Sequence, residues 1–324
     1  MNLIKTALPV CFVLCALVIL FRSYPDVFTI AFGSPVAFLR LLTLATPLLI
    51  TGLAVHACLT TGRILIAGEG IYAAGGITVA IVGTTFVDSP LGLWIGLVLS
   101  FLIGASLGAL ISWLRETKGI HEVISGLLMN YILQLLTRYL ASGPFRDPTS
   151  DAPHTKELPW TLPLLSSASE VNIGIFVCAI ILIAYTYLFN KTLLGRFVRS
   201  LATTDGVAFT SGLPPVRTRL IVMGIATGLI GLAGAIMIGS AGPFRRFPAD
   251  FYGSGVGFDG LIVGLLCGPN TWMIVPSTIL IAGFSHISDA LSLATALPRQ
   301  VGSVVGASLF IVTAIVRYRK VPRS

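Results

Sequence analysis

Most of this chain consists of long apolar runs joined by short polar connections. Its 324 residues are 55% hydrophobic and only 10% charged, with a mean hydropathy of +0.93, which lies outside the range of soluble domains. About 20 consecutive apolar residues suffice for a helix to span a bilayer. The sequence therefore predicts an all-α polytopic membrane bundle, one transmembrane permease domain over 1–324. The expected segments are roughly 7–21, 37–60, 64–86, 91–114, 123–140, 172–189, 218–240, 256–268, 272–285 and 299–316.

The basic residues indicate which segment ends face the cytoplasm, where Lys and Arg are retained. Ten segments with both termini cytoplasmic place thirteen basic residues inside and six outside, with Arg40 and Arg138 unassigned near outer segment ends. The net charge of +8 is therefore a topology signal and does not indicate a nucleic-acid partner. The inner set is Lys5, Arg63, Arg115, Lys118, Lys191, Arg196, Arg199, Arg217, Arg219, Arg317, Arg319, Lys320 and Arg323, and the outer set is Arg22, Arg146, Lys156, Arg245, Arg246 and Arg299.

Two connections are long enough to contact partners. Residues 141–171 are rich in Pro, Ser, Asp and Thr, and we expect them outside, as an ordered cap or a surface for a soluble partner. Residues 190–219 carry five basic residues against one acid, Asp205, and their apolar residues are interspersed with these charges. They are typical of one or two short amphipathic helices that a cytoplasmic partner can grip. The alternative is an interfacial helix lying on membrane lipid.

Two apolar segments are broken by glycine where a lipid-facing helix should be continuous, at 67–76 (AGEGIYAAGG) and 253–260 (GSGVGFDG). Irregular backbone at membrane depth is tolerated only where protein or water satisfies its polar groups, and such interruptions point to the translocation site of a transporter. The sequence thus predicts two discontinuous helices.

Each break carries an acid, Glu69 or Asp259, and a charge inside a membrane helix usually faces a cavity. The functional interpretation is a polar substrate pathway that also includes Asn130, Gln134 and Phe258. The structural alternative is that each carboxylate caps the N-terminus of a half-helix, and that Asn130 joins helices.

Several chemistries lack their sequence patterns. No GxxxxGK[ST] or GxSxG occurs, and no spacing of His and Cys is typical of metal ligands. We therefore expect no catalytic or metal site and no ATP hydrolysis by this chain. A carrier coupled to protons or sodium through the two carboxylates is the rival interpretation from another class.

Four stretches carry a family resemblance. They are KGIHEVISGLLMNYILQLLTRYLASGPFRDP at 118–148, GLPPVRTRLIVMGIATGLIGLAGAI at 212–236, GVGFDGLIVGLLCGPNTW at 255–272 and AGEGIYAAGG at 67–76. Together they resemble the bacterial ABC importer permeases of the branched-chain amino acid and simple-sugar type, in particular the nucleoside subgroup. The resemblance runs in unbroken order over roughly 41–316.

The resemblance implies a multi-pass subunit of the bacterial inner membrane. Such permeases work with two copies of a cytoplasmic ABC ATPase, a second identical or homologous permease chain, and an external substrate-binding lipoprotein or periplasmic protein. ATP and Mg would be bound by the ATPase, so this chain would hold no cofactor. A nucleoside is the first expected substrate, followed by riboflavin and then a simple sugar.

The resemblance also implies that the ATPase-coupling helix lies in the cytoplasmic loop 190–219. There the family pattern has a glutamate where this chain has Gly206, beside Asp205, whereas Ala208 and Gly212 match the pattern. The residues expected to couple the chain to its ATPase are Arg196, Arg199, Asp205, Gly206, Ala208 and Gly212.

Overall fold

The computed structural model describes residues 33–86, 89–165, 171–201, 214–240, 245–268 and 270–294, and the regular structure within them consists of helices joined by turns, irregular segments and four isolated β-bridges. The predicted segments 7–21 and 299–316 lie outside the described residues, so the number of ten spans and the side of the termini stay predictions. The helices are α3 (Pro35–Thr60), α4 (Gly68–Thr85), α5 (Leu91–Lys118), α6 (Glu122–Ser142), α7 (Gly174–Lys191), α8 (Leu193–Ser200), α10 (Pro215–Ile238), η1 (Phe251–Ser254), α11 (Val256–Cys267), η2 (Thr271–Met273) and α12 (Ile274–Ala294).

Six of these helical segments are long and apolar enough to cross a membrane: α3, α5, α6, α7, α10 and the segment Thr271–Ala290. The 12 residues of α11 span about 18 Å, less than the hydrocarbon core of about 30 Å. The glycine-rich α4 is not among the six. The predicted break at 67–76 lies almost wholly inside α4, which is continuous from Gly68 to Thr85, so the discontinuity expected there is wrong, whereas the predicted break at 253–260 falls at the change from η1 to α11.

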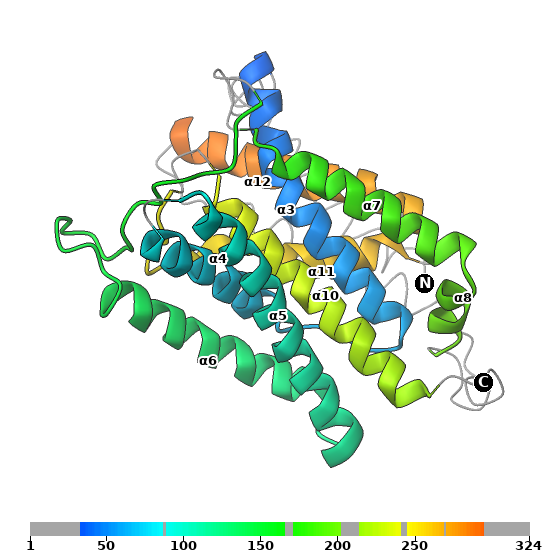
Figure 1. Ribbon diagram of the computed structural model, residues 1–324. Coiled ribbons are helices and arrows are strands. Elements are labelled where there is room, and N and C mark those ends of the chain that lie inside the picture. The colour runs from blue at the N-terminus through cyan, green and yellow to red at the C-terminus, as the bar shows by residue number, and fades with distance from the viewer. Residues whose placement is uncertain are drawn as a thin grey trace, which may run out of the picture.

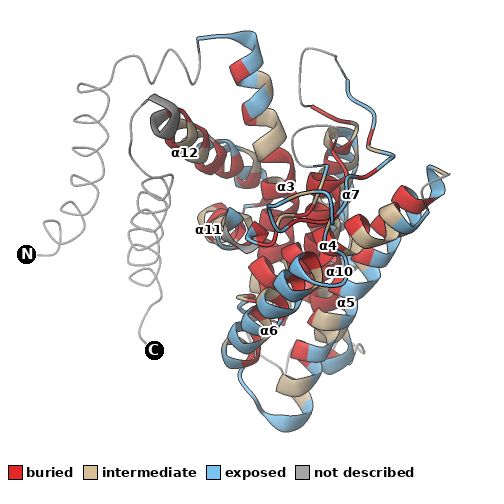
Figure 2. Cartoon of the chain, turned by 90° about the vertical axis from the view of Figure 1, so that its left-hand side faces the viewer, coloured by how far each residue is buried: buried red, intermediate tan, exposed pale blue. Residues whose placement is uncertain are grey.

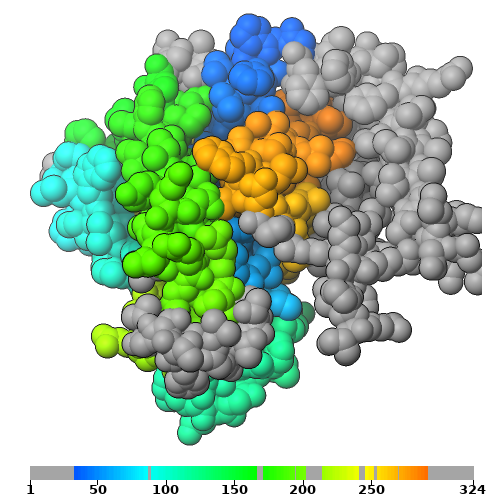
Figure 3. Space-filling model, turned by 90° about the vertical axis from the view of Figure 1, so that its right-hand side faces the viewer, coloured from blue at the N-terminus to red at the C-terminus, as the bar shows by residue number. Residues whose placement is uncertain are grey.

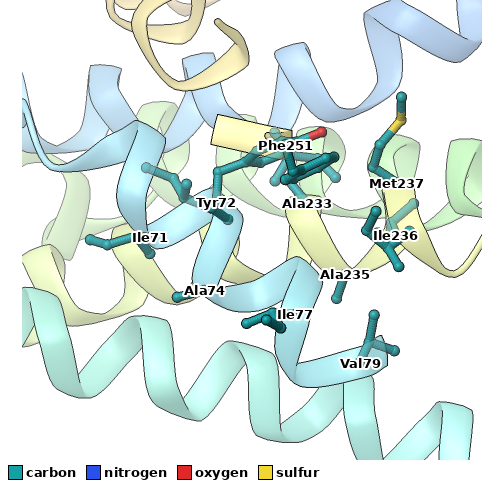
Figure 4. Close-up of a cluster of buried hydrophobic side chains, with 14 of the residues drawn as sticks. Ile71, Tyr72, Ala74, Ile77, Val79, Ala233, Ala235, Ile236, Met237 and Phe251 are labelled. Atoms are coloured by element: carbon teal, nitrogen blue, oxygen red, sulfur yellow. The ribbon is translucent and has the colours of Figure 1, made fainter. Parts of the chain in front are cut away.

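The centre of the bundle is formed by α3, α4 and α10, whose residues are mostly buried, while α5 and α6 expose one side (Figures 1 and 2). Side chains of α4 and α10 interlock there, and Phe251 of η1 lies over Tyr72 of α4 (Figure 4). Helix α7 lies on the surface of the molecule (Figure 3), and its exposed residues include the apolar Phe176, Ile180 and Ile183. Exposed apolar helix faces are expected where a bundle meets lipid.

Small residues allow these helices to approach closely. A Cβ atom added to Gly75 of α4 would lie 1.9 Å from the carbonyl oxygen of Gly231 in α10, and one added to Gly108 of α5 would lie 1.9 Å from Thr227 Oγ1. The hydrophobic effect does not drive helices together inside a membrane, so the van der Waals attraction of close backbone contact has to hold them. Larger residues at these positions would separate α10 from both neighbours.

Local signals set several helix ends. Gly119, with φ of +68°, ends α5 in the left-handed conformation that glycine adopts without strain. Pro214 precedes α10 and Pro215 is its first residue, where a missing N–H costs nothing. The connection between α5 and α6, the short helix α8 and the start of α10 lie at one end of the bundle (Figure 1).

The opposite end is closed by an ordered cap, here defined as residues 143–165 together with 245–251. Backbone hydrogen bonds join its two parts, for example from Thr155 N–H to the Phe247 carbonyl at 3.0 Å and from Leu158 N–H to the Arg245 carbonyl at 2.8 Å. Leu158 is 2% exposed and packs on Gly83 at the end of α4. The loop predicted over 141–171 is thus tied to the bundle along much of its length.

The charges sort between the two ends as the topology argument expects. Arg63, Arg115 and Arg219, all predicted to be cytoplasmic, meet acidic partners at the α8 end. Arg246, predicted to be external, pairs with Glu157 in the cap. The grouping agrees with one consistent orientation, and its direction relative to the cytoplasm stays a prediction.

Candidate functional site

Helices α4 and α11 begin at the same place. Residues 63–66 form no helix before α4 starts at Gly68, and α11 starts directly after Gly255, whose φ of +76° suits glycine. A Cβ added to Gly257 would lie 2.2 Å from the Glu69 nitrogen, so the two N-termini touch through backbone atoms. We call this contact the helix junction, made of Gly68, Glu69, Ser254, Gly255 and Gly257.

Glu69 belongs to α4 but caps α11. One of its carboxylate oxygens accepts hydrogen bonds from the Ser254 hydroxyl and the Gly255 N–H, both at 3.0 Å, and the other accepts from the Gly257 N–H at 2.7 Å. The residue is 1% exposed. No side chain at the N-cap of α11 performs this task, and free N–H groups at a helix start attract a carboxylate. The geometry is that of the structural alternative for Glu69; a role in the substrate pathway stays a prediction.

Asn130 caps α4 in the same manner. Ala67, at the N-cap of α4, has no side chain that can accept a hydrogen bond. Instead Asn130 of α6, which is 2% exposed, accepts the Gly70 N–H at 2.8 Å and donates to the Ile66 carbonyl at 2.7 Å. The starts of α4 and α11 are therefore each capped by a side chain from a different helix.

The other predicted pathway residues lie around the junction. Asp259, in the first turn of α11, is half-buried, and its carboxylate is 3.5 Å from the Ser285 hydroxyl of α12. Phe258 beside it is 42% exposed. Gln134 is half-buried and lies one turn beyond Asn130 on α6. The structure thus brings Glu69 and Asn130 to the start of α4, and it places Phe258 and Asp259 at the start of α11.

Buried aromatic residues cover the junction on the side of the cap. Tyr72 stacks on Phe251 with ring centroids 5.5 Å apart, and Phe251 contacts Phe247 at 4.8 Å. Tyr72 is 1% exposed and Phe247 is 1% exposed. Phe247 and Phe251 follow the basic pair Arg245 and Arg246 in the chain, yet both are buried in the bundle. Their arrangement closes the junction from the cap.

The described part of the predicted coupling loop contains α8. Thr192 caps this helix by accepting the Gly195 N–H at 3.3 Å. Arg196 is exposed, and the guanidinium of Arg199 lies 5.6 Å from the ring centroid of Phe189 in α7. The predicted residues Asp205, Gly206, Ala208 and Gly212 lie outside the described residues.

An aromatic chain continues from α8 toward the far end of α11. Phe189 stacks on Tyr185 with ring centroids 4.9 Å apart, and the Tyr185 hydroxyl lies 2.5 Å from Nδ1 of the buried His56. The other ring nitrogen of His56 is 3.1 Å from the carbonyl oxygen of Gly268, which follows α11. The α8 end is therefore in contact with the C-terminus of α11.

These features are typical of a membrane transport protein: apolar helices pack around α4 and the short helix α11, whose N-termini meet at a buried polar junction. The model of the family "Branched-chain amino acid transport system / permease component" matches residues 37–319, and the chain belongs to this family.

Characterised relatives are similar over most of their length. The chain is 26% identical to the nucleoside ABC transporter permease protein NupB of Lactococcus lactis subsp. cremoris, over 90% of this chain and 83% of that protein. It is 28% identical to the guanosine ABC transporter permease protein NupP of Bacillus subtilis, over 83% and 78% of the two chains. It is also 28% identical to the glucose ABC transporter permease protein TsgB13 of Haloferax volcanii, over 92% and 82%.

The chain is therefore an ABC importer permease, a multi-pass transport subunit, and the family resemblance drawn from its four sequence stretches is confirmed. Permeases of this class work in general with an ATPase and a substrate-binding partner. This membership decides against the ion-coupled carrier.

Proposed function

We propose that this permease imports a nucleoside across the inner membrane of a bacterium. The observation that carries the proposal is its similarity to two permeases of nucleosides, NupB and NupP, along most of both chains. A simple sugar is the second candidate, favoured by the similarity to the glucose permease. Riboflavin is the remaining candidate from the sequence, because its flat ring and polyol resemble the base and sugar of a nucleoside.

Transport would proceed by alternating access at the helix junction. Glu69, Asn130, Gln134, Phe258 and Asp259 would line or gate the pathway, because a polar solute needs hydrogen-bonding groups where the bundle is otherwise apolar. The caps supplied by Glu69 and Asn130 make the starts of α11 and α4 depend on a neighbouring helix. A shift of α6 or α4 would therefore move the start of the next helix as well.

The energy would come from outside the chain. A cytoplasmic ATPase holding ATP and Mg would close on the loop 190–219, and a ligand-driven switch of this kind requires contacts that differ between the two states. Arg196, Arg199, Asp205, Gly206, Ala208 and Gly212 would make those contacts. A second permease chain, identical or homologous, would complete the membrane part, and an external lipoprotein or periplasmic protein would deliver the substrate to the cap.

Reconstitution tests the proposal. The permease, its ATPase and its binding protein are placed in liposomes, and uptake of radiolabelled guanosine is measured with ATP, without ATP, and with an ATPase that binds but does not hydrolyse ATP. We expect uptake only with hydrolysis, competed by unlabelled uridine but not by glucose or riboflavin. Competition by glucose alone would contradict the nucleoside assignment. Uptake that follows an ion gradient without ATP would contradict ATP-driven import.

A further inference from the structure

We propose that a network of charged side chains carries motion from the coupling loop to the start of α4, with Glu116 and Arg63 as its positioning residues. We call it the ionic network, and it consists of Arg63, Arg115, Glu116, Glu122 and Arg219. The inference depends on the ATP-driven transport proposed above, and it adds the route by which movement reaches the junction.

The network joins four separate parts of the chain. Glu116, near the end of α5, pairs with Arg63 and lies 3.8 Å from Nη1 of Arg219 at the start of α10. Arg63 also lies 3.5 Å from Glu122, the first residue of α6, and Arg115 reaches the same carboxylate at 3.4 Å. The side chains of Arg63, Glu116 and Arg219 are each 11% exposed. The charges are thus largely withdrawn from water.

One end of the network holds the coupling loop. Nη2 of Arg219 donates to the carbonyl of Leu201 at 3.2 Å. Leu201 is itself 3% exposed and packs with Phe197 of α8. Arg219 therefore connects the end of α8 with the start of α10, the two points at which the loop leaves and rejoins the described structure. A displacement of the loop by the ATPase would therefore move the Arg219 side chain.

The other end holds the unwound segment before α4. Arg63 lies in that segment, and one residue later the Ile64 N–H approaches the Glu122 carboxylate at 3.5 Å. Further along, the Asn130 side chain hydrogen-bonds the Ile66 carbonyl and the Gly70 N–H, on either side of the helix start. Glu69 lies within this stretch and caps α11. Between Arg63 and the helix junction, side chains of α5 and α6 therefore contact the Arg63 side chain, the Ile64 N–H, the Ile66 carbonyl and the Gly70 N–H.

The shared carboxylate explains how such a network can switch. Glu116 has two arginine partners, one close and one at 3.8 Å, so a small displacement of α10 changes which of them it favours. Largely buried ion pairs contribute little to net stability when compared with apolar residues of the same size. Packed structures respond to small shifts by moving between discrete arrangements. A carboxylate between two arginines on different elements is an arrangement with two such states.

A labelling experiment tests this route without requiring the transported substrate. In a variant whose native cysteines are replaced by alanine, Phe258→Cys places a reporter in the first turn of α11. The complex with the ATPase in liposomes is treated with a water-soluble maleimide, with and without ATP, and the ratio of the two labelling rates is compared. The test variants are Glu116→Gln and Glu116→Asp, and Glu157→Gln, which breaks the exposed Glu157–Arg246 pair at the cap, is the matched control.

We expect Glu116→Gln to reduce the ATP-dependent change in labelling by about tenfold, within the range of typical coupling between sites. ATPase association and basal hydrolysis should persist, Glu116→Asp should restore most of the response, and Glu157→Gln should match the parent. An unchanged response in Glu116→Gln overturns the proposed route. Equal loss of response, association and hydrolysis in both Glu116 variants also overturns it, because the residue would then be needed only for folding. No response in the parent overturns ATP-driven movement itself.

Discussion

The carboxylate of Glu69 offers the sharpest test of the helix junction. Replacing it by glutamine keeps the size of the side chain but exchanges one acceptor oxygen for an NH2 group. The remaining oxygen can accept from Ser254 and Gly255, as one oxygen does now, and the NH2 group then faces the Gly257 N–H. Two donors pointing at each other in a site that is 1% exposed cannot both find an acceptor there.

The cost follows from these contacts. A hydrogen bond to a charged group contributes about 1.5–3 kcal/mol, and the lost charge at a helix N-terminus contributes about 0.3–1 kcal/mol. We therefore expect Glu69→Gln to destabilise the junction by about 3 kcal/mol, a factor of roughly 100 in the equilibrium constant. Glu157→Gln, at a pair with side chains 39% and 53% exposed, should cost about 0–1 kcal/mol.

Thermal denaturation in detergent, followed by the loss of the monodisperse peak in size-exclusion chromatography, measures the difference. Glu69→Gln should lower the midpoint by about 5 °C or more, taking roughly 2 °C per kcal/mol for a chain of this size. The Glu157→Gln midpoint should stay near that of the unmodified protein. Equal midpoints for Glu69→Gln and the unmodified protein would refute the capping argument, since the hydrogen bonds would then contribute nothing measurable.

Three further substitutions test other parts of the account. Gly234→Ala places a methyl group 1.9 Å from the backbone carbonyl oxygen of Tyr72 and should lower the stability in the same denaturation assay by about 1–3 kcal/mol or more. Gly283→Ala, with open space around its Cβ, is the control and should leave the midpoint unchanged. Similar midpoints for the two variants would contradict the close approach of α4 and α10. Asn130→Ala loses both hydrogen bonds to the α4 start and should lower the midpoint by the equivalent of about 1–3 kcal/mol. Gln134→Ala, one turn further along α6, is the control and should lower the midpoint less. Equal midpoints for the two variants would argue against the cap. Gly212→Trp should abolish uptake and ATPase association in the reconstituted importer, and normal values of both would show that the coupling loop is assigned wrongly.

Hydropathy alone located most of the spans. The expected segments 91–114, 123–140 and 172–189 fall within or close to α5, α6 and α7, because long apolar runs have few alternatives to a membrane helix. The last described helix is longer than expected, since α12 continues to Ala294 through polar residues such as His286 and Ser288 that are buried in the bundle. A hydropathy window ends at such residues, although a helix packed against protein does not.

Sequence reasoning found the junction but not its construction. The glycine-rich stretch 253–260 marks the change from η1 to α11, but the stretch 67–76 lies at the start of α4 and does not interrupt it. The partner of Glu69 could not be predicted, because Ser254 lies 185 positions further along the chain and only the fold brings it near. For the same reason Glu116 and Glu122 were not singled out, since the sequence shows their charges but not the arginines from α10 and the α3–α4 connection that meet them.

The most direct test of the account is the side of the membrane on which α8 lies. Lys191→Cys, at the exposed end of α7 next to α8, and Lys156→Cys, in the exposed cap, are introduced separately into the variant without native cysteines. Both are then treated with an impermeant maleimide in intact cells and in inverted vesicles. The account predicts that Lys191→Cys reacts only in inverted vesicles and that Lys156→Cys reacts only in intact cells. Labelling of Lys191→Cys from outside would contradict it, because a cytoplasmic ATPase could not then reach the coupling loop.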